Sequence, residues 1–233
     1  MNKLHFTVDG QSCTAQPGQT ILEAARANGI YIPSLCWYDG MKPAGSCRVC
    51  TVRVAGRFMA ACTQPVSEGM AVENMVADLE DLRKALVEML FVEGNHMCPT
   101  CEKSGNCELQ ALAYRYQMLV PRFPYNFPVR EVEPASPKFL LEHNRCVKCL
   151  RCVRGVRAKD GTSVFGALHR GRHKRIAVDP GLAAALAEGK VREAMDRCPV
   201  GSILKKEVGF VVPVGRRKYD AAPIGSDVQK AKG

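Results

Sequence analysis

Residues 146–152 read CVKCLRC, and the pair CP follows at residues 198–199. Proteins that hold two [4Fe–4S] clusters repeat the pattern C-x2-C-x2-C-x3-C-P, in which each fourth cysteine binds the other cluster. In this chain the fourth position of the first repeat is Val156, and no cysteine triplet precedes Cys198. Because both losses remove the same cluster, the pattern predicts a single [4Fe–4S] site. Its ligands would be Cys146, Cys149, Cys152 and Cys198.

The first group of cysteines along the chain has a different spacing, C-x10-C-x2-C-x11-C. Its members are Cys36, Cys47, Cys50 and Cys62. The loop residues 43–46 read PAGS, and such small, turn-prone residues let backbone N–H groups approach cluster sulfides. The plant-type spacing is C-x4-C-x2-C, so the first gap is longer here, but four thiolates can still enclose two irons. We therefore expect a [2Fe–2S] site, with zinc as the less favoured alternative because zinc ligands usually come as two closely spaced pairs.

Between these groups lies a set of only three cysteines, spaced C-x2-C-x5-C. They are Cys98, Cys101 and Cys107, and His96 precedes them. Three thiolates leave a cluster one ligand short, and histidine is a known replacement for cysteine on iron. We therefore predict a second [4Fe–4S] site that His96 completes, the alternative being a histidine at the surface or behind the ligands. Cys13 is left over and is expected to be a buried thiol.

The N-terminal segment has the element order of a β-grasp fold. The expected strands cover residues 4–8, 12–15, 52–54, 57–61 and 70–72. Thr20 and Glu23 form a capping-box pattern at the start of a helix that ends at Asn28. The order strand, strand, helix, cysteine loop, strand, strand predicts a β-grasp [2Fe–2S] ferredoxin-like domain over residues 1–77.

The rest of the chain divides by composition. Asp78 is expected to cap an amphipathic helix, which opens a small helical His/Cys3 [4Fe–4S] domain over residues 78–120. Residues 121–137 contain five prolines and are interpreted as a Pro-rich linker without regular structure. A hairpin and two helices complete a [4Fe–4S] ferredoxin-like domain over residues 138–210, and residues 211–233 are expected to be an extended C-terminal tail. The predicted class is α+β.

Length, cysteine content and charge indicate the cellular compartment of the protein. The chain has 233 residues and 12 cysteines, with no secretory signal and no apolar run long enough for a membrane span. We therefore expect a cytoplasmic protein whose clustered cysteines hold metal rather than form disulfides. Lys and Arg number 10 against 12 acidic residues in residues 1–120, but 23 against 11 in residues 121–233.

The basic half of the chain has two interpretations. The run RGRHKR at residues 170–175 could indicate nucleic-acid binding, but aromatic residues are not interleaved with it. Thiolate-bound clusters are net anionic, and a basic shell around them accounts for the charge more simply. A nucleic-acid-binding zinc protein is thus the alternative from a different class, and we expect no nucleic-acid partner.

Motifs for substrate chemistry are missing from the sequence. There is no G-x-G-x-x-G after a strand, no phosphate-binding Walker loop, no G-x-S-x-G and no H-E-x-x-H. Three predicted clusters without a substrate motif indicate an electron relay with no catalytic residues of its own.

Four stretches resemble a known family: LCW at 35–37, GSCRVC at 45–50, EKSGNCELQ at 102–110, and CP at 198–199. They are similar to the N-terminal electron-transfer region of the largest subunit of respiratory complex I, which iron-only hydrogenases and the small diaphorase subunits of NAD-reducing [NiFe] hydrogenases share. Many relatives place the histidine four residues before the first cysteine of the middle set, a position that is Gly94 here. The chain ends 35 residues after Cys198, which favours the stand-alone diaphorase subunit.

The resemblance implies one [2Fe–2S] and two [4Fe–4S] clusters on the three ligand sets given above. It also implies a flavin- and NAD-binding diaphorase large subunit as a partner, with FMN and NAD on that partner, and [NiFe] hydrogenase small and large subunits. The implied function is electron relay between hydrogen oxidation and NAD+ reduction. The alternative is the equivalent relay subunit of an NAD-linked formate dehydrogenase, a multisubunit iron-only hydrogenase or a complex I-like assembly.

Overall fold

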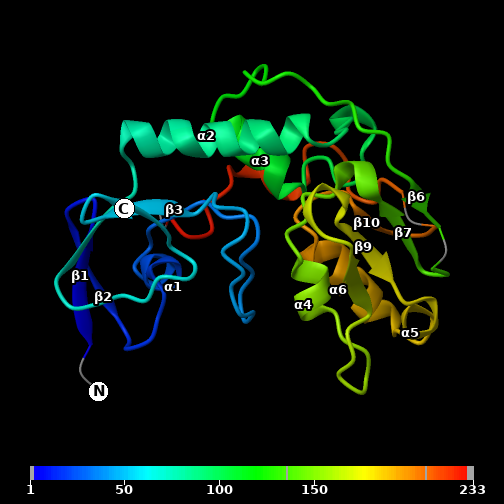
Figure 1. Ribbon diagram of the computed structural model, residues 1–233, viewed down its shortest axis with the longest axis horizontal. Coiled ribbons are helices and arrows are strands. Elements are labelled where there is room, and N and C mark those ends of the chain that lie inside the picture. The colour runs from blue at the N-terminus through cyan, green and yellow to red at the C-terminus, as the bar shows by residue number, and fades with distance from the viewer. Residues whose placement is uncertain (1–2, 135, 208, 230–233) are drawn as a thin grey trace.

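A mixed five-stranded sheet forms the N-terminal part of the computed structural model, which describes residues 3–134, 136–207 and 209–229. The strands are β1 (Leu4–Val8), β2 (Gln11–Ala15), β3 (Thr51–Val54), β4 (Arg57–Ala60) and β5 (Met70–Glu73). Their order is β2-β1-β5-β3-β4; β1 and β5 are parallel and the other pairs antiparallel (Figure 1). Helix α1 (Ile21–Ala27) buries Ile21 and Leu22 in the core of this sheet. The predicted β-grasp domain is confirmed.

The start of α1 shows why the sequence forms a helix there. The Thr20 hydroxyl accepts a hydrogen bond from the Glu23 N–H at 3.3 Å, and the Glu23 carboxylate accepts one from the Thr20 N–H at 2.9 Å. This reciprocal pair satisfies two N–H groups that the first turn leaves without partners. The capping box predicted from the sequence is therefore confirmed. The chain then leaves the helix at Asn28 and runs without regular structure to β3, and this loop carries three cysteines.

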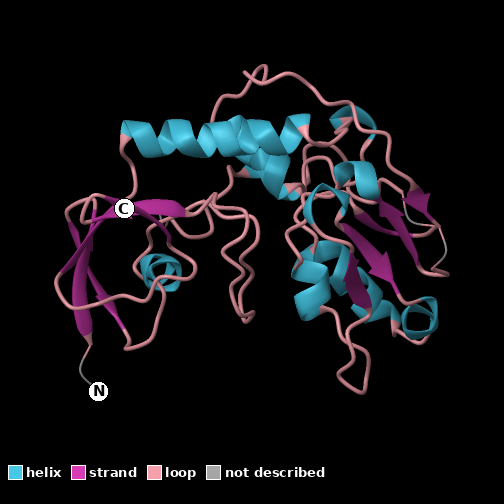
Figure 2. Cartoon of the chain, viewed as in Figure 1, coloured by secondary structure: helices cyan, strands magenta, loops and turns pink. Residues whose placement is uncertain are grey.

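Helix α2 (Ala77–Val92) extends from the sheet domain toward the C-terminal half (Figures 1 and 2). The prediction that Asp78 caps it is wrong, because Val76 occupies the cap position and Asp78 lies in the first turn. An acidic side chain there still interacts favourably with the positive end of the helix dipole. The 3-10 turn η1 (Cys98–Thr100) and helix α3 (Glu108–Arg115) follow, and α3 packs against α2.

The C-terminal domain combines two small sheets with three short helices. Its elements are β6 (Val132–Glu133), β7 (Phe139–Glu142), η2 (His143–Arg145), α4 (Arg151–Gly155), β8 (Phe165–Leu168), η3 (Gly171–His173), β9 (Arg175–Val178), α5 (Pro180–Ala184), α6 (Glu188–Arg197) and β10 (Ile203–Lys205). The predicted hairpin corresponds to β8 and β9. Strand β6 lies inside the stretch interpreted as a linker, so the expectation of no regular structure there is wrong at this point, where β6 pairs with β7.

The C-terminal segment folds back onto the N-terminal domain instead of extending away from the protein (Figure 1). It contains α7 (Lys218–Ala221), and Asp227 pairs with Arg26 of α1 at 3.1 Å. Ile224 and Val228 are buried in the larger core. The expectation of an extended tail is therefore wrong for the described part of residues 211–229, because its apolar residues find a surface to pack on.

One apolar core joins the middle and C-terminal parts of the chain to the loop of the first cysteine group. Leu35 and Val49 of that loop belong to the same core as Leu112 of α3 and Val200 after α6. This shared packing holds the three cysteine-rich segments in a fixed arrangement. Within the described ranges, the helices are all too short or too polar to cross a membrane.

Candidate iron–sulfur centres

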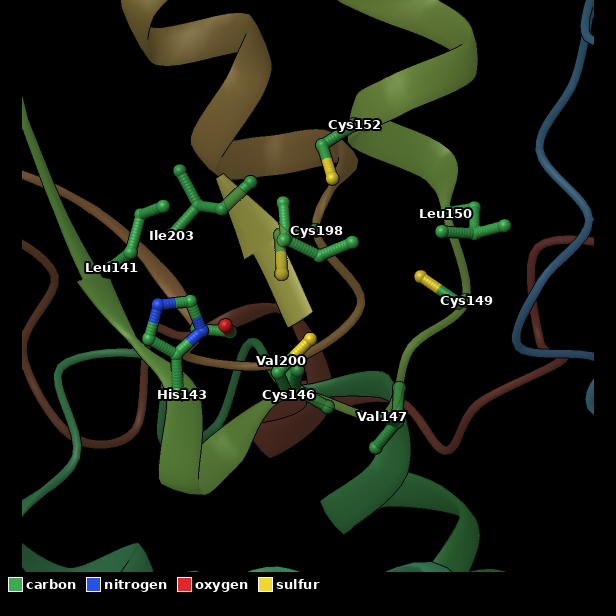
Figure 3. A pocket seen from close by; sticks show the side chains of 12 residues that line it. Leu141, His143, Cys146, Val147, Cys149, Leu150, Cys152, Cys198, Val200 and Ile203 are labelled. Carbon is green, nitrogen blue, oxygen red and sulfur yellow. The ribbon is translucent and has the colours of Figure 1, made fainter. Parts of the chain in front are cut away.

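The cysteines of residues 146–152 and Cys198 line one small space beneath α4 and α6 (Figure 3). Their four sulfur atoms point into it in Figure 3. The chain can wrap around this space because Lys148 and Leu150 adopt left-handed φ angles of 52° and 61°. Burial raises the pKa of the Cys149 thiol to about 12. Four sulfur donors around one enclosed space fit a cluster with four cysteine ligands.

The middle group also converges on one space. It is lined by His96, Cys98, Cys101 and Cys107, together with Arg145 and Gly201. The Nε2 atom of His96 is buried and has no hydrogen-bond partner. Burial lowers the pKa of His96 to about 4, so that its imidazole is neutral near pH 7. A neutral ring whose free nitrogen is buried beside three thiols has the chemistry of an iron ligand.

Two glycines make room for this middle site. A Cβ atom on Gly94 would lie 2.3 Å from Nε2 of His96 and 2.9 Å from the backbone oxygen of Asn144. A Cβ atom on Gly201 would lie 2.5 Å from Sγ of Cys101. The position where many relatives carry the histidine thus holds a glycine here, and the ring of His96 occupies the space beside it.

We expect Gly94→Ala to empty the middle site. The added methyl group would overlap the His96 ring, and the backbone on its other side leaves no room to shift. Iron content should fall by about four atoms per chain, and the reduced-state EPR signal of the middle site should disappear. Gly189→Ala in α6 is the matched control, because a Cβ there meets nothing within 4 Å. Full iron content in Gly94→Ala would contradict this account of the site.

The thiols of the first group lie close enough to hydrogen-bond with one another. The Cys47 and Cys62 thiols donate toward Cys36 and hold its pKa well below the ordinary value, while burial acts in the opposite direction. Cys50 likewise has a lowered pKa because of the Cys62 thiol. A thiolate that its neighbours stabilise is ready to bind metal. Cys36, Cys50 and Cys62 are buried, and Cys47 is partly exposed.

The structure therefore brings together each of the three predicted ligand sets. Among the described residues, no three His, Cys, Asp or Glu side chains are placed to hold a single metal ion. The remaining cysteine, Cys13, is buried in the sheet domain as expected, and its Sγ lies 3.4 Å from the oxygen of Gln11.

Sequence reasoning missed the charged residues that connect these sites. Arg151, beside Cys152, is buried and forms two 2.7 Å hydrogen bonds with the carboxylate of Glu108, which follows Cys107. Lys103 is also buried, and its ammonium donates to the Met195 oxygen at 2.9 Å. The only signal available in the sequence was that each of these residues lies within two positions of a predicted ligand.

The fold and the three cysteine-rich sites define an iron–sulfur protein with three cluster-binding regions. Residues 1–75 match the family described as a 2Fe-2S iron-sulfur cluster binding domain. Residues 83–122 match the NADH-ubiquinone oxidoreductase-G iron-sulfur binding region, and residues 136–204 match the ferredoxin-like domain of NADH-quinone oxidoreductase subunit 3. These matches confirm the predicted fold class and cluster types. They favour iron–sulfur clusters over the zinc alternative.

Whole-chain similarity is stronger still. The chain is 50% identical to the gamma subunit of the NAD-reducing hydrogenase HoxS of Cupriavidus necator, over 95% of each protein. It superposes with a TM-score of 0.88, at 40% identity, on a chain in the crystal structure of NAD+-reducing [NiFe]-hydrogenase in the H2-reduced state, covering 97% of this chain and 96% of that one. The mitochondrial 78 kDa subunit of NADH-ubiquinone oxidoreductase of Candida albicans is 32% identical over 89% of this chain but only 29% of its own length. The chain belongs to the family of NAD-reducing hydrogenase gamma subunits.

Proposed function

We propose that this chain is the iron–sulfur relay subunit of an NAD-reducing [NiFe] hydrogenase, carrying electrons between hydrogen oxidation and NAD+ reduction. The observation that carries the proposal is the convergence of three separate ligand sets in a chain that matches a hydrogenase gamma subunit over nearly its whole length. The relatives in NADH-quinone oxidoreductase support the same relay role, but the chain covers only about a third of their length.

We assign the ligands as follows. The [2Fe–2S] cluster is held by Cys36, Cys47, Cys50 and Cys62, the middle [4Fe–4S] cluster by His96, Cys98, Cys101 and Cys107, and the third cluster, also [4Fe–4S], by Cys146, Cys149, Cys152 and Cys198. When bound, each cluster can accept and return an electron. The chain contributes the sulfur and nitrogen donors, the spacing between the sites and the surrounding charge.

The protein around the ligands favours the addition of negative charge. Arg145 lines the middle site and also pairs with Glu102 at 2.9 Å. Arg151 lies next to the third site, where its guanidinium is near the Cys149 and Cys198 thiols. Cations beside a cluster stabilise its reduced, more negative form, and burial of the ligands keeps water away from it.

Partners follow from this role. The relay needs a flavin- and NAD-binding diaphorase large subunit, which would carry FMN and NAD, and the small and large subunits of a [NiFe] hydrogenase. We place the assembly in the cytoplasm, because all twelve cysteines are free thiols in this fold and eleven of them are assigned as ligands.

The decisive experiment is to co-purify the chain with its partner subunits under anaerobic conditions and assay hydrogen-dependent NAD+ reduction. We expect activity that requires this chain, together with a brown colour and about ten irons per copy. A colourless protein containing zinc would overturn the iron–sulfur assignment. Formate-dependent activity without hydrogen-dependent activity would assign the relay to a formate dehydrogenase instead.

A further inference from the structure

The guanidinium of Arg154 connects two of the ligand sets directly. Arg154 lies in α4, two positions after the proposed ligand Cys152. Its Nη2 atom donates to the backbone oxygen of Cys36 at 2.7 Å and to that of Cys149 at 3.3 Å. Cys36 belongs to the first set and Cys149 to the third. One side chain therefore holds the backbone of both sites.

The surrounding contacts fix this guanidinium against the loop that carries Cys36. Its Nη1 atom donates to the backbone oxygen of Lys42, farther along the same loop. The next residue, Gly155, allows the loop to approach α4 closely, because a Cβ there would lie 2.9 Å from Sδ of Met41 and 2.4 Å from the Arg197 guanidinium. Three carbonyl contacts and a tight helix–loop approach leave Arg154 little freedom to move.

Neighbouring aromatic and cationic groups reinforce the same junction. The ring of Tyr38, two residues after Cys36, lies 5.5 Å from the Arg151 guanidinium and 4.9 Å from that of Arg197. Arg197 directly precedes Cys198. The loop of the first site is thus held by cationic residues beside ligands of the third.

We propose that Arg154 is a positioning residue that sets the separation of the first and third sites and raises the reduction potential of both. The inference rests on the proposed relay function. The transfer it serves moves one electron from one site to the other, so that one site is oxidised as the other is reduced, and no proton or group moves. Electron tunnelling falls steeply with distance, so a fixed separation fixes the rate. A cation shared by the two sites stabilises added negative charge on either one.

The test uses the complete chain, loaded anaerobically with iron and sulfide. Arg154→Leu should lower the midpoint potentials of the first and third sites in an EPR-monitored titration, and leave that of the middle site unchanged. It should also weaken the magnetic interaction between the reduced first and third clusters, which depends on their separation. Arg154→Lys keeps the charge but cannot reach both loops in the same way. It should hold the potentials nearer to those of the unchanged protein while the magnetic interaction still weakens.

Arg170→Leu is the matched control, because it removes the same charge from an exposed position after β8. Arg154→Leu with potentials and magnetic interaction equal to those of the control would overturn the proposal, as would an equal shift at all three sites. If Arg154→Leu fails to retain iron, the proposal is tested with Arg154→Lys alone. A magnetic interaction between the first and third clusters that is as strong in Arg154→Lys as in the unchanged protein overturns the proposal. Failure of the relay function would instead appear as three normal clusters in the unchanged chain without hydrogen-dependent NAD+ reduction in the complex.

Discussion

Replacing Glu108 with Gln is expected to cost about 3–5 kcal/mol of stability, because it removes the carboxylate that pairs with the buried Arg151 guanidinium. Both hydrogen bonds of the pair measure 2.7 Å, and the Arg151 side chain is only 3% exposed. Burial works against the charged form of Arg151, but the Glu108 carboxylate outweighs it and raises the arginine pKa. We expect the urea concentration that bleaches the cluster absorbance to fall by at least about 1 M.

The double variant Glu108→Leu with Arg151→Met tests whether the loss of stability comes from the unpaired Arg151 charge. Replacing both partners of a buried ion pair by apolar residues is often nearly neutral, so the double variant should recover most of the lost stability. Glu193→Gln in α6 is the matched control, since its pairs with Lys190 and Arg197 are partly exposed and should contribute less than about 1 kcal/mol. Equal bleaching midpoints for Glu108→Gln and this control would show that the pair does not hold the sites together.

This pair also shows which parts of the site a sequence can predict. The cysteines were predictable because their spacing is local: residues 146–152 lie on one short stretch of chain, and the pattern itself carries the chemistry. Glu108 and Arg151 lie 43 positions apart, and each is an ordinary charged residue in its own segment. Only the packing of α3 against the C-terminal domain brings them together. Arg154 is hidden for the same reason, because its contact with Cys36 spans 118 positions.

In the fold, too, the elements that depend on local sequence patterns were predictable, and those that depend on distant contacts were not. The β-grasp domain was predictable from alternation, turn signals and the Thr20–Glu23 capping box, all of which act over a few residues. The described part of the C-terminal tail was not, because its Gly- and Pro-rich composition indicates an extended chain, whereas Ile224 and Val228 pack onto a distant surface. Strand β6 was missed because two residues in a Pro-rich stretch form a strand only when β7 is beside them. Tertiary contacts determine the conformation of both segments.

His96→Ala is expected to remove the middle cluster while leaving the other two in place. The variant deletes the only non-cysteine donor of the predicted set, and its three thiols would then be one ligand short. Iron content should fall by about four atoms per chain, with the EPR signal of the middle site lost and those of the first and third sites retained. His173→Ala, at an exposed position in η3, is the control and should keep all three signals.

The variant His96→Cys tests what the imidazole contributes to the middle site besides its fourth ligand. A neutral nitrogen donor in place of a thiolate leaves a cluster less negative and easier to reduce, as histidine ligation does in Rieske centres. The neutrality of this ring near pH 7 follows from its burial, which lowers the pKa to about 4. If the cysteine reaches the iron, the middle potential should therefore fall while the iron content is kept. If His96→Ala keeps both its iron content and its middle-site potential, His96 is not a ligand. The buried Nε2 atom of His96 in the unchanged protein would then need a partner other than iron.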